Sequence, residues 1–490
     1  MNPMAMIAGL GTLAATVPRP REIHAKRLGP TVTPRRFSCF AVVVFIFLHM
    51  PLALLMKFVP AIATLHALLA LAIGLKWAWG GRENVKVAYM GAYITGSEVL
   101  WRSVGASVFW EFGKYATALL FIVALVRSHR WRLPALPTIY FLLLIPATIL
   151  TVFQVSFSQA KNMISFNLSG PFALTVSVIF FVQMQLTRRQ FLRLMLAFIG
   201  PVMGIVAVIL FGFATTDITF GHESNVAASG GFGANQVSAL LGMACVAAFL
   251  CLLDTMLRWE LKILLFGLLV EFAVQSALTF SRAGIYYAAA SIVAGCILLM
   301  RHLRSAIQLT VILGGVFLVG YYVVYPQLDA YTGGALSARF EDTRLTGRAQ
   351  IMDADLKIME EYPVLGIGIG QAMSERAKFF RGFAAHTEFT RLLSEHGSFG
   401  CIALVLLVAM GIRNVVVART NRGRAVAASL VAYSFCFMSG NGMRMVLPSF
   451  VFGLASVSLV PDKRIVRQKT PGPTMAKPLS RPLIRSFRHA

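Results

Sequence analysis

Apolar runs of roughly 20 residues alternate with short polar connections along almost the whole chain. A helix of that length crosses the roughly 30 Å hydrocarbon core of a bilayer, because each residue advances it by about 1.5 Å. The pattern therefore predicts an all-α polytopic membrane protein with about 14 transmembrane helices, within a range of roughly 12 to 14. The predicted spans are residues 38–57, 60–79, 86–104, 107–126, 134–153, 171–187, 191–213, 235–256, 260–279, 283–300, 304–325, 397–418, 424–440 and 444–461.

One long polar stretch, residues 326–396, interrupts this pattern and divides the chain. Residues 37–325 form the predicted N-terminal membrane domain, and residues 397–461 form the C-terminal spans. The two ends, residues 1–36 and 462–490, are basic and contain prolines, so we expect tails without regular structure.

The positions of Lys and Arg predict the orientation of the spans. If the N-terminal tail lies in the cytoplasm, the connections rich in Lys and Arg all fall on that side, as in bacterial inner-membrane proteins. Both termini are then cytoplasmic, and the polar stretch becomes one large periplasmic loop. The same reasoning places outside residues 154–170, 214–234, 280–283 and 440–443.

The composition supports this interpretation. The chain is 57% hydrophobic and 13% charged, whereas a soluble protein carries about 25% charged residues. Its net charge of +25 follows from topology, since most Lys and Arg lie in short connections and tails, so we expect no nucleic-acid partner. The six cysteines lie in or beside apolar runs and show no metal-type spacing, so no disulfide framework or metal site is predicted.

Arginines on the predicted outer side are the first candidates for chemistry. Arg282 ends the ninth span, and the large loop adds Arg339, Arg344 and Arg348. Arg344 and Arg348 are four residues apart, so a helix would place them on one face. Guanidinium groups suit the oxygens of a diphosphate. The alternative is a solvated or snorkelling set of charges.

A second candidate group lies in residues 386–396, where apolar residues recur at helical spacing. We expect a helix at the membrane surface before the twelfth span. His386, Glu388 and Glu395 are its candidate proton acceptors, and His396 is a weaker one because it lies nearer the apolar span. The alternative for a single histidine is a structural role.

The loop also contains a predicted helix and a glycine run. Residues 347–361 are expected to form a helix that ends before Pro363, which cannot continue it. Gly366, Gly368 and Gly370 follow, but no Lys-Ser/Thr pair comes after them, so a nucleotide-binding loop is rejected. We expect these glycines to allow close approach of the backbone to a helix or a ligand.

Other polar residues lie in or beside the spans. Asn235 begins the eighth span and is expected to cap it, and Ser281 lies beside Arg282. Glu98 and Arg102 are four residues apart and form a predicted internal ion pair. We interpret that pair, and Glu271, as structural.

Five motifs together resemble the O-antigen ligase and Wzy-type polysaccharide polymerase family over about residues 225–420. Each motif is short, and their order, spacing and shared outer face carry the resemblance. The motifs are Gly231-Phe232-Gly233-Ala234-Asn235, Thr279-Phe280-Ser281-Arg282, Gly347-Arg348, Pro363-Val364-Leu365-Gly366-Ile367-Gly368 and the segment from His386 to Gly397.

The resemblance implies a GT-C-like architecture and a metal-independent transferase without a cofactor. Such proteins transfer a glycan from an undecaprenyl diphosphate carrier to an acceptor hydroxyl at the periplasmic face. It implies that Arg282 and Arg348 bind the diphosphate and that His386 orients or deprotonates the acceptor. The family usually has Asn after this histidine, whereas this chain has Thr387.

With these roles we assign His386, Arg282 and Glu388 to catalysis. The predicted substrate-binding residues are Arg348, Arg344, Arg339, Asn235 and Ser281.

The predicted function is polymerisation of exopolysaccharide or O-antigen repeat units. One alternative is an O-antigen ligase that transfers glycan to lipid A-core, and another is a flippase for lipid-linked oligosaccharide. A scaffold subunit of an assembly complex is the third. The expected partners are the undecaprenyl diphosphate-linked substrate, its glycan or lipid A-core acceptor, membrane lipids, a flippase and a chain-length regulator.

Overall fold

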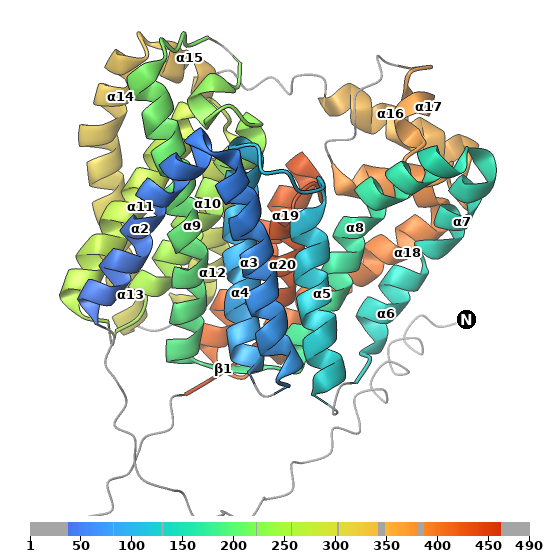
Figure 1. The fold of residues 1–490 in the computed structure, drawn as a ribbon, viewed down its shortest axis with the longest axis horizontal. Helices are drawn as coiled ribbons and strands as arrows, with labels where there is room; N and C mark the ends of the chain where they lie inside the picture. The colour runs from blue at the N-terminus through green and yellow to red at the C-terminus, as the bar shows by residue number, and fades with distance from the viewer. Residues whose placement is uncertain are drawn as a thin grey trace, which may run out of the picture.

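The protein is a bundle of α-helices with helical loop segments at one end (Figure 1). The computed structural model describes residues 38–81, 83–128, 132–221, 223–255, 257–300, 303–341, 348–379 and 387–461. The first half of the chain contains α2 (Cys39–Phe58), α3 (Pro60–Trp79), α4 (Asn84–Ser103), α5 (Phe112–Arg127), α6 (Ala135–Leu142), α7 (Ile145–Gln154), α8 (Phe157–Val182), β1 (Gln185–Thr187) and α9 (Arg188–Thr215).

The second half contains the helices of the polar loop between further apolar helices. In order, it has η2 (Ala227–Ser229), α10 (Ala234–Leu252), α11 (Trp259–Leu278), α12 (Ala283–Leu299), α13 (Leu303–Leu318), η3 (Val319–Val324), α14 (Tyr325–Tyr331), α15 (Ala335–Glu341), α16 (Arg348–Glu361), α17 (Ala372–Arg376), α18 (Glu388–Val417), α19 (Asn421–Asn441), α20 (Val446–Leu454) and β2 (Ser458–Val460).

Nine helices in the described ranges are long and apolar enough to cross a membrane. The structure therefore agrees with a polytopic all-α membrane protein, and it does not confirm the predicted number of about 14 spans. The shorter or more polar helices α4, α5 and α19 still pack within the bundle. Side chains of α4 and α5 include buried charged groups, which lower their mean hydropathy.

Two boundaries differ from the predictions. Residues 154–170 were expected to be a connection, but a capping box at Ser156 and Gln159 starts α8 at Phe157. Residues 444–461 were expected to span the membrane, but helix is confined to α20, and the chain then turns into β2. A nine-residue helix covers only about 13 Å.

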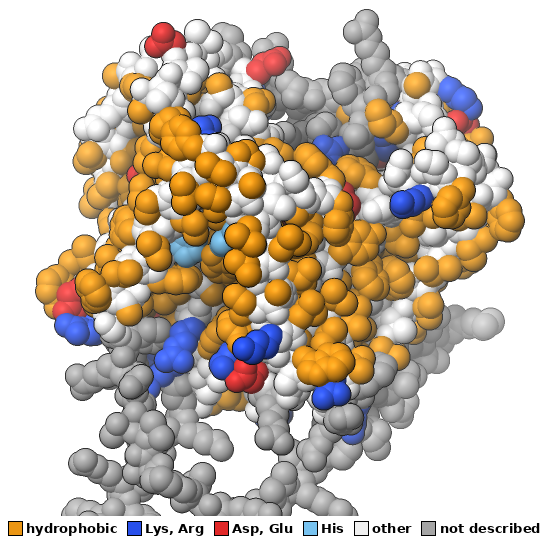
Figure 2. All heavy atoms as spheres, viewed as in Figure 1, with side chains coloured by type: hydrophobic (Ala, Val, Ile, Leu, Met, Phe, Trp, Pro, Cys, Tyr) orange, Lys and Arg blue, Asp and Glu red, His pale blue; other side chains and the backbone are white. Residues whose placement is uncertain are grey.

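The two ends of the bundle differ in the elements they carry. Strands β1 and β2 form a parallel pair in which Leu186 lies opposite Leu459, and β1 lies at the lower end in Figure 1. The loop helices α14, α15, α16 and α17 lie at the upper end. Figure 2 shows hydrophobic side chains across the middle of the visible face and a row of basic side chains near its lower edge.

Aromatic side chains join helices that are distant in sequence. Phe121 of α5 stacks on Phe180 of α8, with ring centroids 4.1 Å apart. Phe181 packs edge-on against Phe450 of α20, with centroids 5.5 Å apart. These contacts fix α20, and with it the preceding turn after α19, against α5 and α8.

Candidate active site

A cavity of about 300 Å³ lies between α8, α17, the first turns of α18 and the turn from α19 to α20. We call it the α18 cavity. Its wall combines apolar residues such as Met163 and Phe166 with many polar side chains. The polar side chains on the wall belong to Asn162, Asn167, Arg376, Thr387, Glu388, Arg391, Glu395 and Arg444.

The first turns of α18 provide three charged groups on one face. Glu388, Arg391 and Glu395 are three and four residues apart, which brings them together on a helix. Arg391 forms an ion pair with Glu388, and its Nη1 donates to Glu395 Oε2 at 2.6 Å. Its Nη2 donates to the Asn167 carbonyl on α8 at 3.2 Å. Arg391 is therefore a cation fixed by two carboxylates and one carbonyl group.

The same turns are buried, contrary to the prediction of a helix on the membrane surface. Glu388, Arg391 and Glu395 are each at most 6% exposed. The polar residues pair with one another and with α8 and α16, so the segment packs inside the protein. This pairing also explains why α18 begins well before the predicted start of the span at residue 397.

A second ion pair attaches the loop helices to α18. Arg376 of α17 donates from Nε to Asp355 of α16 at 2.6 Å, and both side chains are almost fully buried. Asp355 also accepts from Thr390 Oγ1 at 2.7 Å and from Ser394 Oγ at 3.2 Å, both on α18. Four groups thus satisfy one another, and they hold Arg376 at the cavity wall.

The turn between α19 and α20 brings Arg444 to the opposite wall. The backbone of this turn is held by buried side chains: the Met443 N–H donates to Glu388 Oε2 at 3.3 Å, and Lys114 Nζ donates to the Met443 carbonyl at 3.0 Å. Arg102 Nη1 donates to the Arg444 carbonyl at 3.3 Å.

The predicted ion pair between Glu98 and Arg102 is confirmed, with 2.7 Å between Oε1 and Nη2. The other carboxylate oxygen of Glu98 accepts from the Val446 N–H at 2.8 Å. A second buried pair, Glu111 with Lys114, lies beside it. These charged groups of α4 and α5 support the turn that carries Arg444, which gives them a positioning role.

Arg444 lies near two other guanidinium groups and one carboxylate. Burial lowers the pKa of Arg444, and the neighbouring guanidinium groups of Arg376 and Arg391 lower it further, against the opposing effect of Glu388. Arginine carries a positive charge at neutral pH in proteins. Three guanidinium groups thus share one cavity with the carboxylates of Glu388 and Glu395, and guanidinium groups can bind an anionic ligand with several oxygens.

The glycine run lies directly against α18, as predicted. Gly366 and Gly368 have φ of 68° and 102°, and a Cβ on Gly366 would lie 2.3 Å from the Glu395 carbonyl carbon. The Ile367 N–H donates to the Ser394 carbonyl at 3.0 Å, and the Gly368 N–H donates to that of Glu395 at 3.2 Å. Only glycine allows so close an approach at these backbone angles.

The opposing part of α18 bends at Gly397, which has φ 55° and ψ −132° inside the helix. Because of this bend, the carbonyl groups of Ser394 and Glu395 accept hydrogen bonds from the glycine run. The Ser398 N–H donates to the Pro363 carbonyl at 2.8 Å. Helix α16, which precedes the glycine run, ends at Glu361, as predicted from the position of Pro363.

A second polar cluster surrounds the turn between α11 and α12. Phe280 has φ 57°, the one positive φ at a non-glycine position among the described residues, and its side chain is fully buried. Its carbonyl accepts from Arg339 Nε at 3.0 Å. Ser281 Oγ donates to the amide oxygen of Asn235 at 2.7 Å. Arg282 follows and is the N-cap residue of α12 (Ala283–Leu299).

This arrangement corrects the expected role of Asn235 as a helix cap. The residue at the N-cap of α10 is Gly233, and Asn235 lies one residue inside the helix. Its amide instead binds Ser281. A turn held in an unfavourable conformation is a common feature of ligand sites, so this cluster stays a candidate for binding.

The two clusters are connected by packing between α12 and α19. Asn441 Nδ2 of α19 lies 3.5 Å from the hydroxyl oxygen of Tyr287 on α12. Asn441 directly precedes Gly442, which lines the α18 cavity. Helix α12, whose N-cap is Arg282, therefore packs along α19, the helix that leads into the cavity wall.

Two predicted site residues, His386 and Arg344, lie outside the described residues, and Arg348 is the first residue of α16. Thr387, the chain neighbour of His386, lines the α18 cavity. Its Oγ1 accepts from the Phe389 N–H at 3.3 Å and so caps α18.

His396 is 1% exposed, and neither ring nitrogen has a hydrogen-bond partner in the structure. In the described part of the chain, no group of three or more His, Cys, Asp or Glu residues could hold a metal ion.

Sequence reasoning missed Arg376, Arg391 and Arg444 as residues of the cavity, and Lys114 as a support for the turn. One signal for Arg444 was present, because it follows a turn predicted to lie outside, where topology requires no cation. A buried Lys within a predicted span is a comparable signal.

Comparison with known families supports the resemblance. The family model of the O-antigen ligase matches residues 267–405, and the resemblance to the O-antigen ligase and Wzy-type family is thereby confirmed. The matched stretch includes the Phe280 turn, the loop helices and the polar turns of α18. A search of curated proteins finds no match.

Proposed function

We propose, from the match to the O-antigen ligase family, that this protein is a membrane glycosyltransferase that uses an undecaprenyl diphosphate-linked glycan as donor. We further propose that it acts at the periplasmic face of the inner membrane and polymerises repeat units of an exopolysaccharide or O-antigen. The observation that carries the proposal is the α18 cavity, where Arg376, Arg391 and Arg444 meet next to Thr387.

The guanidinium groups suit the leaving group of this reaction. The acceptor hydroxyl oxygen attacks the anomeric carbon of the donor sugar, and the bond from that carbon to the diphosphate oxygen breaks. The electron pair leaves with undecaprenyl diphosphate, whose negative charge grows at the bridging oxygen. Preorganised cations stabilise that charge, and removal of one such donor typically costs about 100-fold or more in rate.

The acceptor proton needs a base beside the cavity. His386 directly precedes Thr387 on the cavity wall, so we assign the proton transfer to its imidazole. Glu388 accepts from Arg391 and from the Met443 N–H. We assign it to fixing Arg391 and the Arg444 turn, in place of direct proton transfer.

The turn at Phe280 would bind the parts of the donor or acceptor that lie outside the α18 cavity. Arg339 and Arg282 flank that turn, and Ser281 and Asn235 stand beside them. We propose that this cluster binds glycan or phosphate oxygens, while the α18 cavity contains the reacting bond.

A reconstituted assay tests the proposal. Purified protein in liposomes, supplied with an undecaprenyl diphosphate-linked repeat unit, should produce glycans that grow by one repeat at a time. Arg444→Gln should reduce the rate about 100-fold or more. The control Arg413→Gln removes the same charge from an exposed site on α18 and should keep wild-type activity.

The same assay and a deletion strain together separate the alternatives. Movement of the lipid-linked sugar across the bilayer without elongation would contradict the proposal and favour a flippase. In a deletion strain, a single repeat on the lipid core would identify a polymerase, and full-length glycan left on the carrier would identify a ligase. Normal glycan attachment and length, with loss of partner association, would indicate a scaffold.

A further inference from the structure

A second cavity, of about 210 Å³, lies between α9, α10, α12, α19 and β2. We call it the α9–α19 cavity. Because β2 pairs with β1, the cavity lies at the end of the bundle opposite to the loop helices (Figure 1). It is therefore separate from the α18 cavity, and the two share no lining residue.

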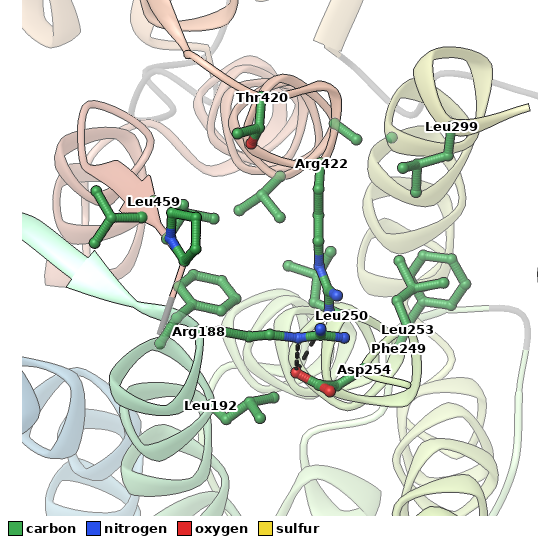
Figure 3. Close-up of a pocket in the computed structure, with 16 residues that line it drawn as sticks. Arg188, Leu192, Phe249, Leu250, Leu253, Asp254, Leu299, Thr420, Arg422 and Leu459 are labelled. Carbon is green, nitrogen blue, oxygen red and sulfur yellow. Dashed lines mark hydrogen bonds and ion pairs between the residues drawn. The ribbon is translucent and has the colours of Figure 1, made fainter. Parts of the chain in front are cut away.

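The walls of this cavity are almost entirely apolar, with one charged corner. Figure 3 shows the side chains of Leu192, Leu250, Leu253, Leu299 and Leu459 arranged around the space. Arg188, Asp254 and Arg422 make up the charged corner. Such a combination of apolar wall and charge matches an amphipathic ligand better than a water-soluble one.

The charged corner has two cations for one carboxylate. Arg188 forms an ion pair with Asp254 and donates from Nη2 to Thr255 Oγ1 at 3.1 Å. Arg422 Nη2 lies 3.7 Å from the same Asp254 oxygen. Figure 3 shows both guanidinium groups directed toward this carboxylate from α9 and α19. One positive charge is therefore in excess.

Arg422 is the cation that lies farther from Asp254, and its side chain is half-buried. It is the second residue of α19 and lies before the predicted span. Burial lowers its pKa, and the neighbouring Arg188 lowers it further, while Asp254 opposes both effects. Both guanidinium side chains keep about a third of their surface exposed, at 27% for Arg188 and 33% for Arg422. An anion can therefore reach them from the cavity.

We propose that the α9–α19 cavity binds an anionic phospholipid of the adjacent leaflet, with its phosphate at Arg422 and Arg188 and part of an acyl chain along the apolar wall. A basic pocket between membrane helices binds anionic head groups through this combination of charge and burial. A zwitterionic lipid fits less well, because it has no net charge to neutralise the excess positive charge. A free phosphate also fits less well, because it would leave the apolar wall of the cavity in contact with water.

A lipid in this position would stabilise the fold by joining helices that are distant in sequence. The corner connects the start of α9, the second residue after α10 and the start of α19. The inference does not depend on the proposed glycan transfer, because it concerns the opposite end of the bundle. Failure of one therefore leaves the other standing.

The experiment uses the full-length protein, purified in an uncharged detergent and stripped of lipid. Binding is measured by native mass spectrometry and by the shift in melting temperature on addition of phosphatidylglycerol, phosphatidylcholine or inorganic phosphate. We expect the wild-type protein to bind phosphatidylglycerol in preference to phosphatidylcholine. Arg422→Gln should weaken phosphatidylglycerol binding roughly five- to tenfold.

Two further variants separate lipid binding from a merely structural ion pair. Arg424→Gln removes an equal charge from an exposed residue one position beyond Gly423, and its lipid affinity should match the wild type. Leu459→Trp leaves the charges intact, but its larger side chain occupies the apolar part of the cavity. It should therefore also weaken phosphatidylglycerol binding.

Three results would overturn the inference. The first is equal phosphatidylglycerol binding by the Arg422→Gln and Arg424→Gln proteins. The second is equal binding of phosphatidylcholine and phosphatidylglycerol to the wild type. The third is stabilisation by inorganic phosphate as large as that by phosphatidylglycerol, combined with unchanged binding in Leu459→Trp, which would mean a site for small anions.

Discussion

Lys114 of α5 donates a hydrogen bond to the carbonyl oxygen of Met443, 329 positions later in the chain. Through this contact, a fully buried cation inside the bundle sets the position of the turn that presents Arg444 to the α18 cavity. Glu111 balances the charge of Lys114. The site thus depends on charges that no substrate is expected to touch.

The first prediction concerns this contact. Lys114→Met should destabilise the protein by about 3–5 kcal/mol, because Glu111 is left as a buried charge without its partner. Thermal unfolding in detergent measures this loss. The double variant Lys114→Met/Glu111→Gln should recover stability but not activity, since the Met443 carbonyl still lacks its donor. Full activity in the double variant would contradict the positioning role.

The second prediction compares the two histidines of one segment. Arg282→Ala and His386→Ala should each abolish glycan elongation in the reconstituted assay, because they remove the proposed binding cation and the proposed base. His396→Leu should retain activity. It should leave stability unchanged or raise it by about 1 kcal/mol, because it removes buried ring nitrogens that have no partner. Loss of activity only in His396→Leu would reverse the assignment.

The third prediction concerns Thr387, which stands where the O-antigen ligase family usually has Asn. Thr387 caps α18, and Asn accepts the same hydrogen bond from the backbone. We expect Thr387→Asn to keep most of the activity. Thr387→Val, which has the same shape without the oxygen, should lose about 1 kcal/mol of stability. Equal stability of the two variants would mean that the cap contributes nothing.

The fourth prediction uses two glycines with similar backbone angles. Gly366 and Gly333 have φ of 68° and 61°, but a Cβ would meet the backbone of α18 only at Gly366. Gly333→Ala should cost about 1 kcal/mol from backbone strain alone. Gly366→Ala should cost more and should reduce elongation, because the glycine run must separate from α18. Hydrogen exchange of residues 363–369 measures that separation, and equal exchange in both variants would disprove it.

Local features of the structure could be predicted from the sequence. Pro363 marks the end of α16, the spacing of Glu98 and Arg102 predicts their ion pair, and the glycine run predicts a close backbone approach. Each of these depends on residues a few positions apart, where helix periodicity and backbone sterics decide the outcome.

The cavity itself could not be predicted in this way. Its wall joins α8, α17, α18 and the Arg444 turn, whose relative positions depend on packing between distant helices. The first turns of α18 were expected to lie on the membrane surface because their apolar residues recur at helical spacing. Their burial depends on partners such as Asn167 and Asp355, which periodicity alone does not reveal.

The attachment of residues 363–369 to the bend at Gly397 has a consequence for access to the site. The middle of the large loop is fixed to α18 by several backbone hydrogen bonds. The loop therefore cannot swing open as a single gate with hinges only at its two ends. If a long glycan enters this site as proposed, the α14–α15 part and the α17 part of the loop must move separately about this fixed point.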